Sequence, residues 1–196
     1  MTQDSLTKRT LRLAPLAEDE WNEEQAALLA PAAEGKGLGR GVLNIFATLA
    51  RHPKLYKRWA VFGSHTLLKS SLPPRDRELV ILRMAWLAQC RYEWGQHLSL
   101  GRDAGLTDSE MALIKEGPDA QDWNSNDRQL LRAVDELKEQ CIISDKTWAA
   151  LAAHYSETQL MDFIFTAGQY HMLAMALNSF GVQLDDRIAE AEAGQL

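Results

Sequence analysis

The stretch Glu78–His97 reads Glu-Leu-Val-Ile-Leu-Arg-Met-Ala-Trp-Leu-Ala-Gln-Cys-Arg-Tyr-Glu-Trp-Gly-Gln-His. It begins with an apolar run of helical period and ends with three reactive side chains, Cys90, Glu93 and His97. On a helix these three lie at i, i+3 and i+7, so they share one face. A thiol, a carboxyl group and an imidazole in apolar surroundings can transfer protons or act as a nucleophile, because burial and neighbouring charges set their pKa values. This stretch therefore predicts both a helical fold and the place of the chemistry.

The composition indicates one globular domain. The chain has 196 residues, of which 46% are hydrophobic and 24% charged, a balance typical of a soluble protein with a core. The net charge is −6 and no run of Lys or Arg occurs, which argues against a nucleic-acid or anionic-membrane surface. No segment reaches about 18 uninterrupted apolar residues, so no membrane span is expected. Met1–Arg12 lacks a signal-peptide core and two cysteines form no disulfide framework, so we expect a cytoplasmic protein.

Caps and stops divide the rest of the chain into helices. Thr107–Glu110 and Ser156–Gln159 have the pattern of capping boxes, and Gly105, Gly117 and Gly181 are typical helix stops. No stretch alternates with a period of two, so the fold is predicted to be all-α, with roughly seven or eight helices. Apolar residues surround most of the last long helix, which predicts a central buried helix. The predicted helices are 42–50, 53–68, 74–103 with an undecided break near residue 90, 107–116, 127–141, 144–153 and 157–180.

The first 41 residues differ in character from the remainder of the chain. Residues 1–41 are predicted to form a polar arm that ends in the glycine-rich loop Glu34–Gly41, and residues 42–196 the helical domain. The loop lacks the Gly-Lys-Ser/Thr ending of a phosphate cradle and no strand precedes it, so a connector is expected. Within the domain, 72–105 and 156–181 each combine a capped start, a long apolar helix and a polar cluster, which indicates a weak internal duplication.

Three blocks of sequence resemble the carboxymuconolactone decarboxylase family of the AhpD-like superfamily: Leu72–Arg83, Cys90–His97 and Ala104–Glu110. The resemblance covers roughly 44–182 and implies the AhpD-like helical fold. The alkylhydroperoxidase motif is a Glu, eleven residues, Cys-x-x-Cys, three residues and a His. Glu78, Cys90 and His97 match it, but Glu93 replaces the second cysteine, so no disulfide can form within the motif. Cys141 could serve as the resolving thiol only if the fold brought it near Cys90.

The decarboxylase branch implies a cofactor-independent enzyme that acts on a small lactone acid from aromatic-ring catabolism. The first hypothesis is therefore acid–base chemistry on a small carbonyl or lactone acid, with Glu93 and His97 as acid and base in either order. Glu78 would support them without touching the substrate, and Tyr92 would donate to a developing enolate. The resemblance also implies a homo-oligomer, a trimer or hexamer, although a dimer fits as well.

Two other hypotheses remain open. One is an AhpD-related thiol peroxidase that uses Cys90, and the other is a non-catalytic helical oligomer that binds a small ligand. For each candidate residue an ordinary role competes: a surface ion pair for Glu93 and His97, a small buried hydrophobe for Cys90, a hydrogen-bonded core residue for each lone histidine. The spacing fits no tight metal signature, so no metal is expected. The candidate substrate-contacting residues are Tyr92, Trp94, His65, Tyr170 and His171.

Overall fold

The computed structural model describes residues 6–34 and 41–191. This part of the chain contains ten α-helices and no strand, which confirms the all-α prediction with more helices than expected. A 3₁₀ turn at Glu18–Glu20 precedes α1, and a π-helical turn at His65–Lys69 extends α3. Within the described ranges, none of the helices combines the length and apolar character that a membrane crossing requires. The helices are α1 Glu23–Ala33, α2 Asn44–Leu49, α3 Pro53–Ser64, α4 Pro74–Leu87, α5 Arg91–Asp103, α6 Asp108–Glu116, α7 Ser125–Gln140, α8 Asp145–Ala152, α9 Glu157–Phe180 and α10 Asp186–Ala191.

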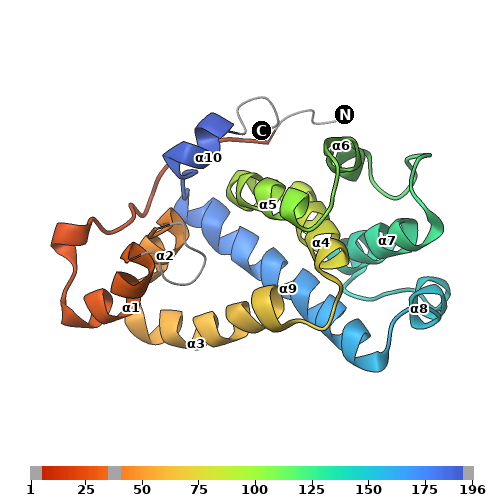
Figure 1. Ribbon diagram of the computed structural model, residues 1–196, viewed down its shortest axis with the longest axis horizontal. Coiled ribbons are helices and arrows are strands. Elements are labelled where there is room, and N and C mark those ends of the chain that lie inside the picture. Colours follow the sequence, from red (N-terminus) through yellow and green to blue (C-terminus); the bar gives the residue numbers. More distant parts are fainter. Residues whose placement is uncertain (1–5, 35–40, 192–196) are drawn as a thin grey trace.

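Helix α4 is the centre of the fold. It contacts α5, α6, α7 and α9, and every residue from Glu78 to Trp86 is buried (Figure 1). Pro74 occupies its first turn, where a missing N–H costs no hydrogen bond. The long helix α9 packs along α4 and crosses the molecule diagonally in this view (Figure 1).

The prediction that α9 is a central buried helix holds for one of its faces. One face of α9 covers the core, but four large apolar side chains on the opposite face are 48–61% exposed. These are Met161, Phe165, Met172 and Met175, which we call the α9 apolar stripe. The apolar residues on one face of α9 pack on α4, whereas those on the opposite face remain about half exposed.

A left-handed residue separates α4 from α5. Ala88 ends α4, Gln89 has φ 52°, and Cys90 is the N-cap of α5. This backbone conformation, uncommon for a residue other than glycine, turns the chain so that α5 packs along α4. The undecided break near residue 90 is therefore real, and it places Glu78 of α4 against His97 of α5.

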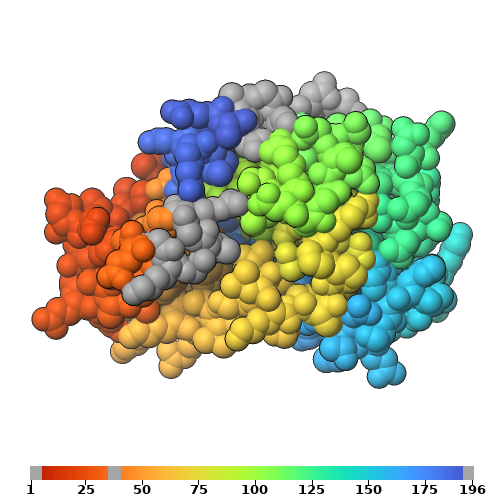
Figure 2. All heavy atoms as spheres, viewed as in Figure 1, coloured from red at the N-terminus to blue at the C-terminus, as the bar shows by residue number. Residues whose placement is uncertain are grey.

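The N-terminal segment packs against the helical domain. Leu6 and Leu29 are buried, α1 contacts α3, and the backbone N–H groups of Arg12 and Leu13 donate to the carbonyl of Phe180 at 2.8 and 3.1 Å. In the space-filling view α1 and the α7–α8 region occupy opposite ends of the molecule (Figure 2). Most of the predicted glycine-rich connector, residues 35–40, lies outside the described residues.

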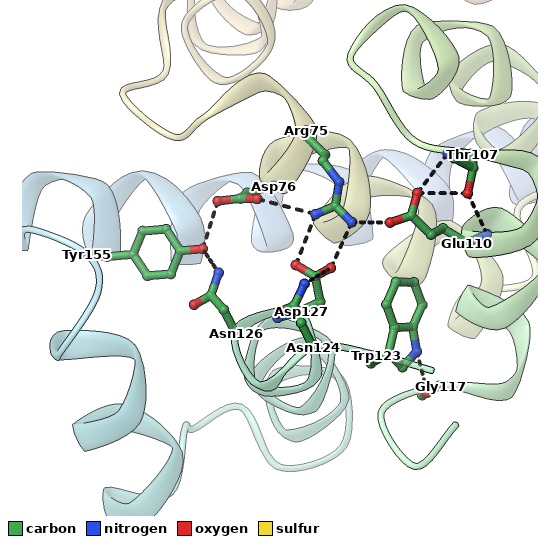
Figure 3. A network of polar contacts seen from close by, with 10 residues as sticks. All are labelled: Arg75, Asp76, Thr107, Glu110, Gly117, Trp123, Asn124, Asn126, Asp127 and Tyr155. Carbon is green, nitrogen blue, oxygen red and sulfur yellow. Dashed lines mark hydrogen bonds and ion pairs between the residues drawn. The ribbon is translucent and has the colours of Figure 1, made fainter. Parts of the chain in front are cut away.

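A network of ion pairs fixes the N-terminus of α4 (Figure 3). The Arg75 guanidinium donates to both oxygens of Asp127 on α7 at 3.0 and 2.7 Å, and also to Glu110 on α6. The Tyr155 hydroxyl, before α9, donates to Asp76 at 2.7 Å. The side chain of Asp127 is only 3% exposed, so the bidentate contact with Arg75 neutralises a buried charge. The network connects α4 to α6, α7 and the start of α9. It therefore fixes the position of α4, the helix against which α5 packs.

Candidate functional site

A cavity of about 260 Å³ lies between α2, α3, the π-helical turn, α5 and α9. Apolar and aromatic side chains form most of its wall, among them Ile45, Phe46, Tyr56, Trp59, Leu67 and Leu173. Helix α5 contributes a polar group of side chains, Tyr92, Glu93, Gln96 and His97, and α9 adds Gln169 and Tyr170. A largely apolar pocket with a few converging polar groups is the usual form of a small-molecule site.

His97 is oriented by a buried ion pair. Its Nδ1 lies 2.6 Å from Oε2 of Glu78, whose side chain is fully buried, and Arg77 donates to the other oxygen of Glu78 at 3.1 and 3.2 Å. Burial raises the pKa of Glu78, but the charges and hydrogen bonds of His97 and Arg77 outweigh it, and the pKa lies below its ordinary value. An ionised carboxylate can only accept, so Nδ1 carries the proton and Nε2 is left for chemistry. No described residue bonds to Nε2.

Glu93 is a buried carboxyl group without a hydrogen-bond partner. It is 2% exposed, and neither of its oxygens meets a donor of good geometry in the described part of the chain. Burial raises the pKa of Glu93 well above its ordinary value, and the nearby Cys90 thiol lowers it only in part. The neutral carboxylic acid is therefore the favoured form. It lies one helical turn before His97, on the wall of the same cavity.

Cys90 lies beside this pair but outside the cavity wall. The thiol is fully buried among Leu173, Leu177 and Val182, and burial raises its pKa well above the ordinary value. Little thiolate would form at neutral pH. Cys141, by contrast, is exposed at the end of α7, and both cysteines are free thiols. The fold therefore does not pair Cys141 with Cys90.

Asp185 holds the start of α5 in place. Its carboxylate accepts from the Tyr92 hydroxyl at 2.9 Å, from Nε2 of Gln96, and from the backbone N–H of Asn44 at 2.9 Å. The Tyr92 hydroxyl in turn accepts from the N–H of Ile45 at 3.2 Å. The segment that carries Asp185 leads into α10, which lies beside α5 (Figures 1 and 2). Sequence reasoning missed Asp185 and Gln96, because nothing local signals a contact 89 residues away.

Tyr170 packs the edge of its ring against His97, with ring centroids 5.0 Å apart. Burial, with the charge of Glu78, raises the pKa of Tyr170 well above its ordinary value, so its hydroxyl stays protonated. The hydroxyl bonds to no other group in the described ranges and is a free donor at the cavity wall. Tyr92 and Tyr170 therefore both line the cavity that Glu93 and His97 also line.

The remaining candidates lie elsewhere. Trp94 packs on Trp86 in the core, with ring centroids 5.3 Å apart. Nε2 of His65, whose side chain is about half exposed, lies 2.9 Å from the largely buried carboxylate of Asp162. His171 is half-buried on α9, and burial together with the charge of Lys138 lowers its pKa. None of the three candidates lines the cavity. Among the described residues, no group of three His, Cys, Asp or Glu side chains is arranged to hold a metal ion.

Comparison with known proteins gives one family match and several similar folds. Residues 53–136, from α3 into α7, match the model of the Carboxymuconolactone decarboxylase family. A sequence search of curated proteins finds no match for the chain.

Three solved structures illustrate the similarity of fold. A peroxidase-related protein with an alkylhydroperoxidase AhpD core from Ralstonia eutropha has a TM-score of 0.76 at 14% identity, covering 91% of this chain and 96% of its own. A peroxidase-related protein from a Silicibacter species gives 0.75 at 14%, covering 94% and 97%. The debrominase Bmp8 in complex with 2,3,4-tribromopyrrole gives 0.73 at 12%, covering 95% and 98%. At these identities the similarity establishes the AhpD-like fold alone.

Proposed function

We propose, since residues 53–136 belong to the carboxymuconolactone decarboxylase family, that the chain is a cofactor-independent enzyme that moves protons at a carbon next to a carbonyl group. One observation carries the proposal. The neutral buried acid Glu93 and the imidazole of His97, which Glu78 orients, lie one helical turn apart on the wall of one cavity. A carboxylic acid kept neutral by burial, one turn from an imidazole oriented by a carboxylate, provides a proton donor and a proton acceptor in one site.

The proposed roles follow from the hydrogen bonds. His97 accepts the proton from carbon at Nε2. The C–H electron pair becomes the C=C bond of the enolate, while the π pair of the carbonyl group moves onto the oxygen. Tyr170, or Glu93 as the carboxylic acid, donates a hydrogen bond to that oxygen. Glu93 then delivers a proton to carbon, and the proton taken up by His97 is returned to the Glu93 carboxylate. Glu78 stabilises the imidazolium, and Asp185 positions Tyr92 and Gln96.

The test is hydrogen–deuterium exchange at the carbon beside the carbonyl, followed by NMR on a panel of small cyclic ketones and lactone acids. Glu93→Gln and His97→Gln should each slow exchange about 10²–10⁴-fold, the usual contribution of general acid–base catalysis. The exposed Glu139→Gln is the matched control and should leave the rate unchanged. If both active-site variants exchange at the wild-type rate on a compound that binds, the proposal is wrong.

A thiol peroxidase that uses Cys90 is the alternative, supported by the contact between the Cys90 thiol and Glu93 and by the similarity to peroxidase-related folds. Burial of the thiol weighs against it. Thiol-dependent peroxide consumption that disappears in Cys90→Ser would favour this alternative, and an equal rate in that variant would exclude it. A non-catalytic binding protein is favoured if Glu93→Gln and His97→Ala leave every ligand interaction unchanged.

We further propose that the α9 apolar stripe is the contact between copies of this chain. Four large side chains that are about half exposed on one helix face form a surface that association would cover. Phe165→Glu should shift the sedimentation coefficient to that of a smaller species. Ile142→Glu, a change of equal charge at a site 63% exposed and outside the stripe, should not. An unchanged sedimentation coefficient in Phe165→Glu would contradict the proposal.

A further inference from the structure

We propose that the cavity takes an uncharged, single-ring carbonyl compound that carries a hydroxyl or N–H group, and that Gln169 and Trp59 recognise that group. The reaction assigned to this ligand rests on the proposed acid–base function, whereas its binding does not. Binding depends on the size of the cavity, on its charge, and on the polar atoms that its wall leaves without partners.

The size and shape of the cavity fit one ring. An apolar cavity of about 150 Å³ holds benzene, so about 260 Å³ leaves room for a ring and a few substituent atoms. The aromatic side chains Phe46, Tyr56 and Trp59 contact one another in the wall, with ring centroids 6.1–6.4 Å apart. Flat aromatic faces favour a flat ligand through stacking and edge contacts.

The charge of the wall disfavours an acid. None of the described residues that line the cavity is Lys or Arg, and the one side chain able to carry a positive charge, His97, already faces the carboxylate of Glu78. Glu93 adds a second carboxyl group. A ligand carboxylate would lose its hydration without gaining a counter-ion, and burial of an unpaired charge is costly.

Two buried polar atoms at the wall have no partner among the described residues. Oε1 of Gln169 is an unpaired acceptor on a residue 2% exposed, and Nε1 of Trp59 is an unpaired donor. Both side chains lie beside Gly63: a methyl group built on Gly63 would lie 3.3 Å from the Trp59 ring and 3.6 Å from Nε2 of the Gln169 amide. Buried polar atoms are normally satisfied. A hydroxyl group both donates and accepts, so one ligand hydroxyl can satisfy Gln169 and Trp59 together.

The same atoms explain how Gln169 would select a ligand. A site built to bond a hydroxyl group rejects the analogue that lacks it, because the polar groups of the protein are then left unpaired. Gln169 precedes Tyr170 on α9, and the Tyr170 ring contacts His97. Trp59 and Gln169 line the same cavity as Glu93 and His97, so one bound ring would present its hydroxyl end to the first pair and its carbonyl end to the second.

Isothermal titration calorimetry with three matched probes tests the inference: 3-hydroxyacetophenone, acetophenone and 3-acetylbenzoate. The hydroxyketone should bind about tenfold or more tighter than the other two. Gln169→Leu should reduce its affinity to that of acetophenone and leave acetophenone binding unchanged. Trp59→Phe, which removes the N–H donor together with part of the ring, should also weaken hydroxyketone binding more than acetophenone binding. Gln140→Leu, at an exposed position, is the matched control.

A gain of function gives a second readout. Leu68 is 62% exposed at the cavity wall. Leu68→Arg should improve 3-acetylbenzoate binding about tenfold by adding a cation that the described wall residues lack, whereas Leu55→Arg outside the wall should not. The inference is overturned if wild-type protein binds 3-acetylbenzoate as tightly as the hydroxyketone, or if Gln169→Leu weakens both ketones equally. Binding that follows the prediction, without any effect of Glu93→Gln on proton exchange, would refute the proposed reaction and leave the ligand class standing.

Discussion

The free energy of unfolding of the wild type should fall as the pH rises, because Glu93 is buried. Replacing Glu93 by glutamine should abolish this fall. The carboxyl group is 2% exposed and has no partner among the described residues, and burial raises its pKa well above the ordinary value of 4.5. A raised pKa means that the folded state binds the proton more tightly than the unfolded state. The free energy of unfolding therefore falls as the pH rises from the ordinary value through the raised one. The largest slope for one proton is about 1.4 kcal/mol per pH unit.

The assay is urea unfolding of the wild type and Glu93→Gln from about pH 5 to about pH 8. Other titrating groups are shared by the two proteins and cancel in the difference, so the stability of the variant relative to the wild type should increase with pH and level off above the folded pKa of Glu93. Glu139→Gln, an exposed change of the same chemistry, should run parallel to the wild type. Parallel curves for Glu93→Gln would refute the effect of burial, and with it the assignment of Glu93 as a neutral acid.

Two further substitutions and one labelling experiment test the fold and the site. Arg75→Ala should lower the free energy of unfolding by about 3–5 kcal/mol, because it strands a buried carboxylate, whereas Arg132→Ala, whose partner is 85% exposed, should cost less than about 1 kcal/mol in the same urea titration. Gly181→Ala should lower the melting temperature, since φ is +69° and the added methyl would overlap the backbone carbonyl of Thr10 in the N-terminal segment. Alkylation followed by mass spectrometry should label Cys141 quickly and Cys90 slowly near neutral pH, and equal rates would contradict the burial of Cys90.

The local rules of helix formation explain why many helix limits can be predicted from sequence. The capping boxes at Thr107 and Ser156 are present, and Gly117 and Gly181 end their helices. Such signals depend on residues three or four positions apart, which a single sequence contains in full. The exposed face of α9 could not be predicted, because an apolar residue on a helix indicates a surface that needs a partner, without indicating whether this chain supplies one.

The candidate site divides in the same way. Sequence places Glu93 and His97 one turn apart, since helical spacing alone decides it. Asp76 and Glu78 lie two positions apart near the start of α4, yet Asp76 bonds to Tyr155 and Glu78 bonds to His97. Alternate positions on one helix point in different directions, and their partners come from other elements.

By itself, the sequence determined an all-α chain, the approximate limits of its helices, and a helix that carries Cys90, Glu93 and His97. The tertiary structure alone decided which of these groups meet. The left-handed turn at Gln89 folds α5 onto α4 and brings Glu78 to His97, and the segment before α10 brings Asp185 to Tyr92. Burial of Glu93 and Cys90, which sets their pKa values, also depends on helices far along the chain. Spacing along a helix is local, whereas desolvation and pairing depend on everything that packs around it.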